Sequence, residues 1–288
     1  MRTEFAPEFD PAFYREIHQD LRHFSDAELF EHYQNYGRAE GRAASPMALR
    51  PSFLEAIRHI RPALEIGPFD NPLLKGPGVK YFDVLDTDAL KKRAERIGSN
   101  PKNVPFIDYV SDVGDLGIVS ETFNLVLSSH VIEHQPDLIR HLNQVAAILK
   151  PAGCYAVFVP DHRYCFDHFL SASNIAEVID AHFAERRVHT LASLIEHSAL
   201  TTHNDAARHW RGDHGDSAID PNRVRGAIQE WTAAAGRYID VHAWQFTPTS
   251  FRSIIGALHA LGLSRLYPLR VYETVYGSVE FCAILAPA

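Results

Sequence analysis

Apolar and polar positions follow two different periods along most of the chain. From residue 51, apolar runs of strand length are separated by stretches in which apolar residues recur every three or four positions. The apolar runs predict strands at 62–67, 79–85, 104–110, 123–129 and 154–160. The periodic stretches predict helices at 51–60, 88–97 and 136–150. Strands separated by helices indicate a parallel α/β sheet with both faces covered.

This alternation stops after Pro160 and resumes near residue 247. Residues 161–245 contain amphipathic helical stretches but no clear strand, at 173–183, 190–200 and 222–236. A helix over 247–262 and strand regions over 264–276 and 279–286 follow. The short Tyr-Gly-Ser turn between the two strand regions predicts a hairpin, so the last strand is expected to be antiparallel.

The first fifty residues have a different pattern. Aromatic and apolar residues at helical spacing predict two or three short helices, with one face at Phe13, Tyr14, Ile17 and Leu21 and another at Leu29, Phe30, Tyr33 and Tyr36. Ser25 is the predicted N-cap of the second helix. We therefore expect a helical N-terminal segment over 1–50 and a main domain over 51–288, in which 161–245 form a helical insertion covering the substrate.

Composition narrows the function classes. The 288 residues carry a formal net charge of −8, which argues against binding to a nucleic-acid backbone. Three scattered cysteines and the absence of a CxxC pair argue against a disulfide framework and a cysteine zinc site. With no signal-peptide core and no apolar run of membrane-spanning length, a soluble, cytoplasmic protein is expected.

Histidine is the unusual residue in this composition. The chain has 17 histidines, and about half of them lie in the insertion. No HExxH motif or other short, fixed ligand spacing occurs. We therefore expect these histidines to be solvated or in satisfied polar contacts, and no metal site is predicted.

Acidic residues and a glycine follow the first strands, where open α/β sheets bind ligands. Glu65 and Gly67 lie at the end of the first strand, and an acid at the end of the second, Asp83 or alternatively Asp86, can accept hydrogen bonds from ribose hydroxyls. The GxGxxG fingerprint of dinucleotide-binding proteins is absent, since Phe69 and Pro72 replace its later glycines. This disfavours a nicotinamide cofactor.

Five motifs in order resemble the class I S-adenosylmethionine-dependent methyltransferases. They are LEIGPFDNP, YFDVLD, SDVGDLG, FNLVLSSHVIEH and LKPAGCYAVFVP, and the match covers about residues 60–160. The resemblance implies a Rossmann-like, doubly wound, seven-stranded sheet of order 3-2-1-4-5-7-6 with the last strand antiparallel. It also implies S-adenosyl-L-methionine as the cofactor.

The resemblance assigns roles to individual residues. The methionine end of the cofactor would lie against the first-strand loop, the ribose against the second-strand acid and the adenine against Asp112, with Asp115 as the alternative. The expected cofactor-binding residues are Glu65, Gly67, Pro68, Asp83, Asp86, Asp112, Val113, Ser129 and His130. The pair Glu133-His134 is expected to be structural.

Further segments resemble methyltransferases of bacterial polysaccharide and glycan biosynthesis. These are VPDHRYCFDHF and, in part, DVHAWQFT, while residues 7–46 resemble a module found beside glycosyltransferases. They imply O-methylation of a sugar or another small or glycan-linked acceptor, and a homodimer or glycosyltransferase contact through the N-terminal segment.

A sugar hydroxyl needs a base to remove its proton. His162 and Asp161 are the expected catalytic residues, with His130 second. The alternatives are an N-methyltransferase of an amino sugar or small amine, which needs no such base, a nicotinamide-dependent dehydrogenase, and a non-catalytic binding or scaffold protein that keeps the cofactor fold.

Overall fold

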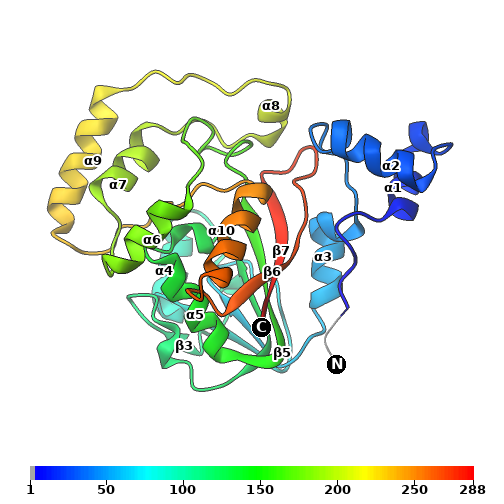
Figure 1. Ribbon diagram of the computed structural model, residues 1–288. Coiled ribbons are helices and arrows are strands. Elements are labelled where there is room, and N and C mark those ends of the chain that lie inside the picture. Colours follow the sequence, from blue (N-terminus) through cyan, green and yellow to red (C-terminus); the bar gives the residue numbers. More distant parts are fainter. Residues whose placement is uncertain (1–3) are drawn as a thin grey trace.

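The computed structural model describes residues 4–288 and contains one seven-stranded sheet (Figure 1). The strands are β1 Ala63–Ile66, β2 Val79–Asp83, β3 Tyr109–Val110, β4 Phe123–Ser129, β5 Leu149–Pro160, β6 Leu266–Val271 and β7 Glu280–Pro287. Their order is β3-β2-β1-β4-β5-β7-β6. The first five strands are parallel, and β7 is antiparallel to β5 and β6, so the predicted fold is confirmed.

Ten α-helices accompany the sheet in the described part of the chain. They are α1 Pro11–Ile17, α2 Asp26–His32, α3 Arg50–Ile57, α4 Thr87–Arg96, α5 Leu138–Ile148, α6 Ile175–Phe183, α7 Leu191–Ala199, α8 Ala206–Trp210, α9 Pro221–Ala234 and α10 Pro248–Ala260. The predicted N-cap of α2 is correct, because Ser25 and Glu28 form a reciprocal capping box there.

The third strand is much shorter than its apolar pattern predicts. Of residues 104–110, only Tyr109 and Val110 pair with β2. Pro105 has no backbone N–H to donate, and Val104 and Ile107 pack instead in a small cluster with Leu90 and Ala94 of α4. Val104 and Ile107 are thus buried against a helix and not within the sheet, whereas Phe106 is exposed.

Strand β5 shows how the sheet divides the core. Tyr155, Val157 and Val159 belong to the larger cluster, which includes apolar residues of α5, α6 and α10. Ala156 and Phe158 belong to the cluster on the other face, with Phe53 and Ile57 of α3. Alternate residues of a strand point to opposite faces, so both faces of this strand are buried under helices.

The N-terminal segment has a small core of its own and is joined to the main domain. Tyr14, Leu21, Leu29 and Tyr33 are buried together. Each of the two predicted faces contributes two of these residues. In Figure 1 these helices lie beside the end of α3, away from the sheet. No helix among residues 4–288 is long and apolar enough to cross a membrane.

Helices α6 to α9 occupy the segment between β5 and α10, as expected. The two ends of this segment meet in a parallel bridge between Asp161 and Phe246, and Ser173 N donates to Gln245 O at 2.9 Å. Helices α7 and α9 pack around Leu194 and Ala227. In Figure 1 these two helices lie on the opposite side of the molecule from α1 and α2.

Candidate functional site

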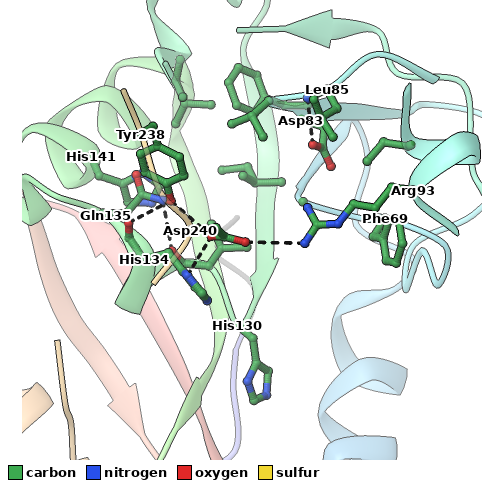
Figure 2. Close-up of a pocket in the computed structure, with 18 residues that line it drawn as sticks. Phe69, Asp83, Leu85, Arg93, His130, His134, Gln135, His141, Tyr238 and Asp240 are labelled. Atoms are coloured by element: carbon green, nitrogen blue, oxygen red, sulfur yellow. Dashed lines mark hydrogen bonds and ion pairs between the residues drawn. The ribbon is translucent and has the colours of Figure 1, made fainter. Parts of the chain in front are cut away.

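A cavity of about 400 Å³ lies at the carboxyl ends of β1, β2 and β4. The strand order reverses between β1 and β4, and ligands of open α/β sheets bind at that point. Its wall is formed by Ile66, Gly67, Phe69, Phe82, Asp83, Val84, Leu85, Leu90, Arg93, Gly114, Leu116, His130, Val131, His134, Gln135, His141, Tyr238 and Asp240 (Figure 2).

The loop after β1 approaches the loop after β4 very closely. Gly67 has a φ of +68°, and a Cβ atom at this position would lie 2.9 Å from Val131 Cγ2. A side chain would therefore meet both backbone strain and a steric clash. The predicted glycine is required by this close approach, and it lines the cavity.

Glu65 faces the protein and not the cavity. Its buried carboxylate accepts hydrogen bonds from Leu73 N and Leu74 N, with contacts of 2.8–3.1 Å. Burial raises the pKa of Glu65 to about 7, against the opposing effect of these amides. The carboxylate thus holds the β1–β2 connection, and its contact with a cofactor stays a prediction.

The two candidate acids after β2 have different surroundings. Asp83 is buried in the cavity wall, where Leu85 N donates to Oδ1 at 3.1 Å. Burial raises the pKa of Asp83, and the backbone hydrogen bonds oppose that rise. Asp86 instead caps α4 by accepting from Ala89 N at 2.8 Å, and it does not line the cavity. The arrangement favours Asp83 as the ligand-binding acid.

The loop after β3 reaches the cavity through other residues than those predicted. Asp112 and Val113 are exposed and absent from the wall, whereas Gly114 and Leu116 are part of it. The alternative acid, Asp115, is held by Gly117 N and Gln144. Their predicted adenine contacts stay predictions.

Pro68 and Ser129 are neighbours in the sequence of the cavity-lining residues Gly67 and His130, but they do not line the cavity themselves. Ser129 Oγ accepts from Arg50 Nη2 at 3.3 Å. His130, which follows it, does line the cavity and adopts a φ of +54°.

A chain of charged groups positions His130. Its Nε2 lies 2.6 Å from Glu280 Oε2, and Glu280 also binds Arg50 at 2.5 Å. Burial lowers the pKa of His130, but the Glu280 hydrogen bond and the charge of Glu133 raise it, and the net shift is upward. The imidazole therefore lies at the carboxyl end of β4, held by Glu280 of β7.

Asp161 and His162 are not part of the cavity wall. Both carboxylate oxygens of the fully buried Asp161 bind Arg163, and one of them also accepts from Thr274 Oγ1 at 2.6 Å. His162 is partly buried, and burial lowers its pKa. Arg163 and Thr274 thus occupy the Asp161 carboxylate, and the catalytic role of this pair stays a prediction.

Sequence reasoning missed two cavity-lining residues near the end of the helical insertion. Tyr238 and Asp240 line the cavity, and Asp240 pairs with Arg93 of α4 at 3.6 Å and with His134 Nδ1 at 3.1 Å. Figure 2 shows Asp240 between these two partners. Only His134 had a sequence signal, through the HVIEH stretch.

One insertion histidine departs from the prediction of solvated or satisfied side chains. His209 and His242 are buried but make polar contacts, with His203 O and Asp167 respectively. His189 is buried, and neither of its ring nitrogens has a hydrogen-bond partner among residues 4–288.

Comparison with known proteins adds a family to this geometry. Residues 74–157 match the family model described as a methyltransferase domain. The matched region runs from before β2 into β5 and contains Asp83 and His130. Such a domain implies S-adenosylmethionine as the cofactor, and the cavity fits it, because Asp83 presents a buried carboxylate beside a glycine loop.

Solved structures with related folds are more distant. The CcbJ methyltransferase from Streptomyces caelestis is 13% identical, with 88% of this chain and 95% of that chain covered and a TM-score of 0.41. The DhpI–SAH complex is 14% identical, with 96% and 95% covered and a TM-score of 0.39.

A structure assigned to the Zn-dependent alcohol dehydrogenases of Rhodobacter sphaeroides is 12% identical, with 81% and 87% covered and a TM-score of 0.41. At these TM-scores the likenesses carry no argument about activity. No curated protein sequence matches the chain.

Proposed function

We propose that the protein is an S-adenosylmethionine-dependent methyltransferase whose acceptor is a hydroxyl of a sugar or of another small or glycan-linked molecule. The observation that carries the proposal is Asp83, a buried carboxylate at the end of β2 in the wall of the cavity. The methyltransferase-domain match over the same strands supports it.

The cavity residues have different proposed roles in binding the cofactor and in proton transfer. Asp83 accepts hydrogen bonds from ribose hydroxyls, and Gly67 lets the backbone approach the ligand. When bound, the cofactor supplies an electrophilic methyl group, so the protein contributes mainly alignment and exclusion of water. His130, fixed by Glu280, takes the proton of the acceptor hydroxyl.

The sugar acceptor is supported by the polar surface of the insertion. A second cavity of about 610 Å³ lies between α6 and α7, with polar groups such as Glu177, Arg186 and Glu196 in its wall. Trp244 also lines it, and Trp244 Nε1 donates to Gln135 O, a residue of the first cavity. One hydrogen bond thus links the walls of the two cavities, and the polar wall of the second suits a ligand rich in hydroxyls.

A calorimetric titration with S-adenosylhomocysteine tests the cofactor. Wild-type protein is expected to bind it and to give no signal with NAD. Asp83→Ala should weaken binding at least tenfold, because a charged acceptor of two hydrogen bonds is lost. Asp86→Ala is the matched control and should bind normally. No binding by the wild type, or an unchanged affinity of Asp83→Ala, would overturn the assignment.

The acceptor class is tested with a panel of nucleotide sugars, free sugars and amines, with methylated products identified by mass spectrometry. We expect products from hydroxyl acceptors, and His130→Gln should lower their turnover at least tenfold while leaving cofactor affinity intact. His162→Gln should leave turnover near the wild-type value. Products formed only from amines would instead establish an N-methyltransferase.

A further inference from the structure

A buried carboxylate without a hydrogen-bond partner lies directly behind the cavity. Glu133 belongs to the short turn Ile132–His134 after β4 and is fully buried. Neither of its carboxylate oxygens has a hydrogen-bond partner among the residues described. Burial of a carboxylate is costly unless it is paired or binds a metal, so this position favours a cation, either a protonated imidazole or a bound metal ion.

Imidazole nitrogens surround this carboxylate. Glu133 Oε1 lies 3.8 Å from His134 Nε2 and 3.8 Å from His242 Nε2. Each of the three residues offers one ligand atom, and these atoms lie within 4.8 Å of one another. Imidazole and carboxylate are the ligand types of catalytic zinc sites with two histidines and one glutamate.

The other nitrogen of each imidazole faces an aspartate. His242 Nδ1 lies 2.6 Å from Asp167 Oδ2, and His134 Nδ1 lies 3.1 Å from Asp240 Oδ1, the latter as an ion pair without an aligned hydrogen bond. A proton on Nδ1, directed at a carboxylate, leaves the lone pair of Nε2 free for a metal. The His242 ring is therefore oriented as metal-ligating histidines usually are, and the His134 ring has an ion-pair contact with Asp240 on the same side.

The backbone fixes the two segments of the set against each other. Glu133 O accepts hydrogen bonds from Ala243 N at 2.7 Å and from Trp244 N at 3.2 Å. His242 comes from the far end of the insertion, and these bonds hold it against the turn after β4. The three side chains thus stand on a rigid frame, which a metal site requires.

We propose that Glu133, His134 and His242 bind a divalent transition-metal cation, with zinc as the cation that their chemistry favours. Zinc–ligand distances of about 2.1 Å place tetrahedral ligand atoms about 3.4 Å apart. The two 3.8 Å separations therefore need to close by only about 0.4 Å. His134 lines the cavity, so the proposed site adjoins the cavity wall.

Two other groups of side chains at metal-binding distance are weaker candidates. In the set Asp167, His197 and His242, the short Asp167–His242 contact already uses the facing atoms. In the set His168, His209 and His214, the Nδ1 atoms of His209 and His214 lie 3.0 Å apart and satisfy each other, and no unpaired carboxylate is present. Neither set contains a carboxylate that, like Glu133, lacks a hydrogen-bond partner on both of its oxygens.

The role of the cation rests on the proposed methyl transfer. A cation held by these three residues would bind the acceptor oxygen at its fourth coordination position and would lower the pKa of the hydroxyl. The carbon–sulfur bond of the sulfonium breaks as the carbon–oxygen bond forms, the neutral thioether leaves, and the hydroxyl proton passes to the base. The sequence predicts no metal site because these ligands come from segments that are distant in the chain.

Zinc binding to the full-length protein tests the site without any activity measurement. Protein freed of metal with a chelator is titrated with zinc in a calorimeter, and cobalt(II) is used in parallel as a spectroscopic probe. We expect one equivalent of tightly bound zinc and a visible ligand-field band with cobalt. Glu133→Gln and His242→Gln should weaken binding at least 100-fold and abolish the band, and Asp167→Asn should weaken it 10- to 100-fold.

His214→Gln is the matched control, because it removes a ligand only from the rival histidine set. It should keep full binding and the cobalt band. Zinc should also raise the melting temperature of the wild type but not of Glu133→Gln, whose circular dichroism reports that it is folded. If Glu133→Gln fails to fold, His134→Gln takes its place in each measurement.

Absence of stoichiometric binding would overturn the proposal. So would binding that survives Glu133→Gln and is lost in His214→Gln. These outcomes are distinct from failure of the proposed function. Binding of S-adenosylhomocysteine depends on Asp83 and not on the cation site, so the two bindings can be lost separately.

Discussion

At the scale of single residues, His141 shows how burial sets a charge state. It lies in α5, its Nε2 is 2.9 Å from Tyr155 Oη, and Tyr155 Oη is 2.7 Å from Ser128 Oγ. Burial lowers the pKa of His141 to about 4. The imidazole is therefore neutral in the folded protein at neutral pH, and it contacts the Tyr155 hydroxyl, which in turn contacts that of Ser128.

The depressed pKa of His141 predicts a loss of stability in acid. In the unfolded chain the pKa is about 6.5, so between pH 6.5 and pH 4 the unfolded state binds more protons and the free energy of unfolding falls as the pH falls. The full effect is ~3 kcal/mol. Denaturant unfolding at pH 7 and pH 4.5 should show a smaller loss for His141→Gln than for the wild type. Replacing the exposed His23 by Gln should leave the loss unchanged.

Elements meet most closely where the loop after β1 passes the loop after β4. Gly67 and Gly76 lie in the same connection, and both have positive φ, +68° and +96°. A Cβ atom on Gly67 would lie 2.9 Å from Val131 Cγ2, whereas nothing lies within 4 Å of one on Gly76. A side chain at either glycine would meet backbone strain, but only one at Gly67 would also clash with the other loop. Comparing substitutions at the two positions therefore distinguishes the two effects.

We expect Gly67→Ala to lower the free energy of unfolding by about 2–3 kcal/mol and Gly76→Ala to lower it by about 1 kcal/mol. Only the first substitution adds a steric clash to the backbone strain. Gly67→Ala should also weaken S-adenosylhomocysteine binding, since Gly67 lines the cavity. Denaturant unfolding and calorimetry measure the two effects. Equal losses for both variants would show that the contact with Val131 contributes nothing.

Over the whole molecule, the N-terminal segment is tied to the sheet by its first described residues. Phe5 is buried in the cluster on the α3 face, and Tyr272 Oη donates to Ala6 O at 2.8 Å. Glu8 accepts from Val271 N at 2.8 Å and pairs with Arg252 of α10. The segment thus covers part of the main core as well as forming its own.

Removal of the Phe5 ring should therefore destabilise the main domain. Phe5→Ala is expected to lower the free energy of unfolding by about 3 kcal/mol, through the lost burial and the cavity that remains. The matched control is Phe30→Ala, since Phe30 in α2 is 49% exposed and should change stability by less than about 1 kcal/mol. A similar change in both would mean that Phe5 contributes no core packing.

The sequence by itself determined the elements and their order. Periods of two and of three to four residues depend only on which side chains must be buried, and they located nearly every helix and strand. The ordered motifs then predicted the sheet order, the antiparallel last strand and the acid of β2. The shortened β3 was not predictable, since its apolar residues pack on α4 and not in the sheet.

Only the tertiary structure decided which side chains meet. Glu65 and Asp161 are acids at strand ends, as predicted, but backbone amides bind the first, and Arg163 and Thr274 bind the second. Glu133 and His242 are far apart in the sequence and lie 3.8 Å apart in space. Local patterns fix the direction of a side chain within its own element, whereas the packing of the insertion over the strand ends fixes what that side chain faces.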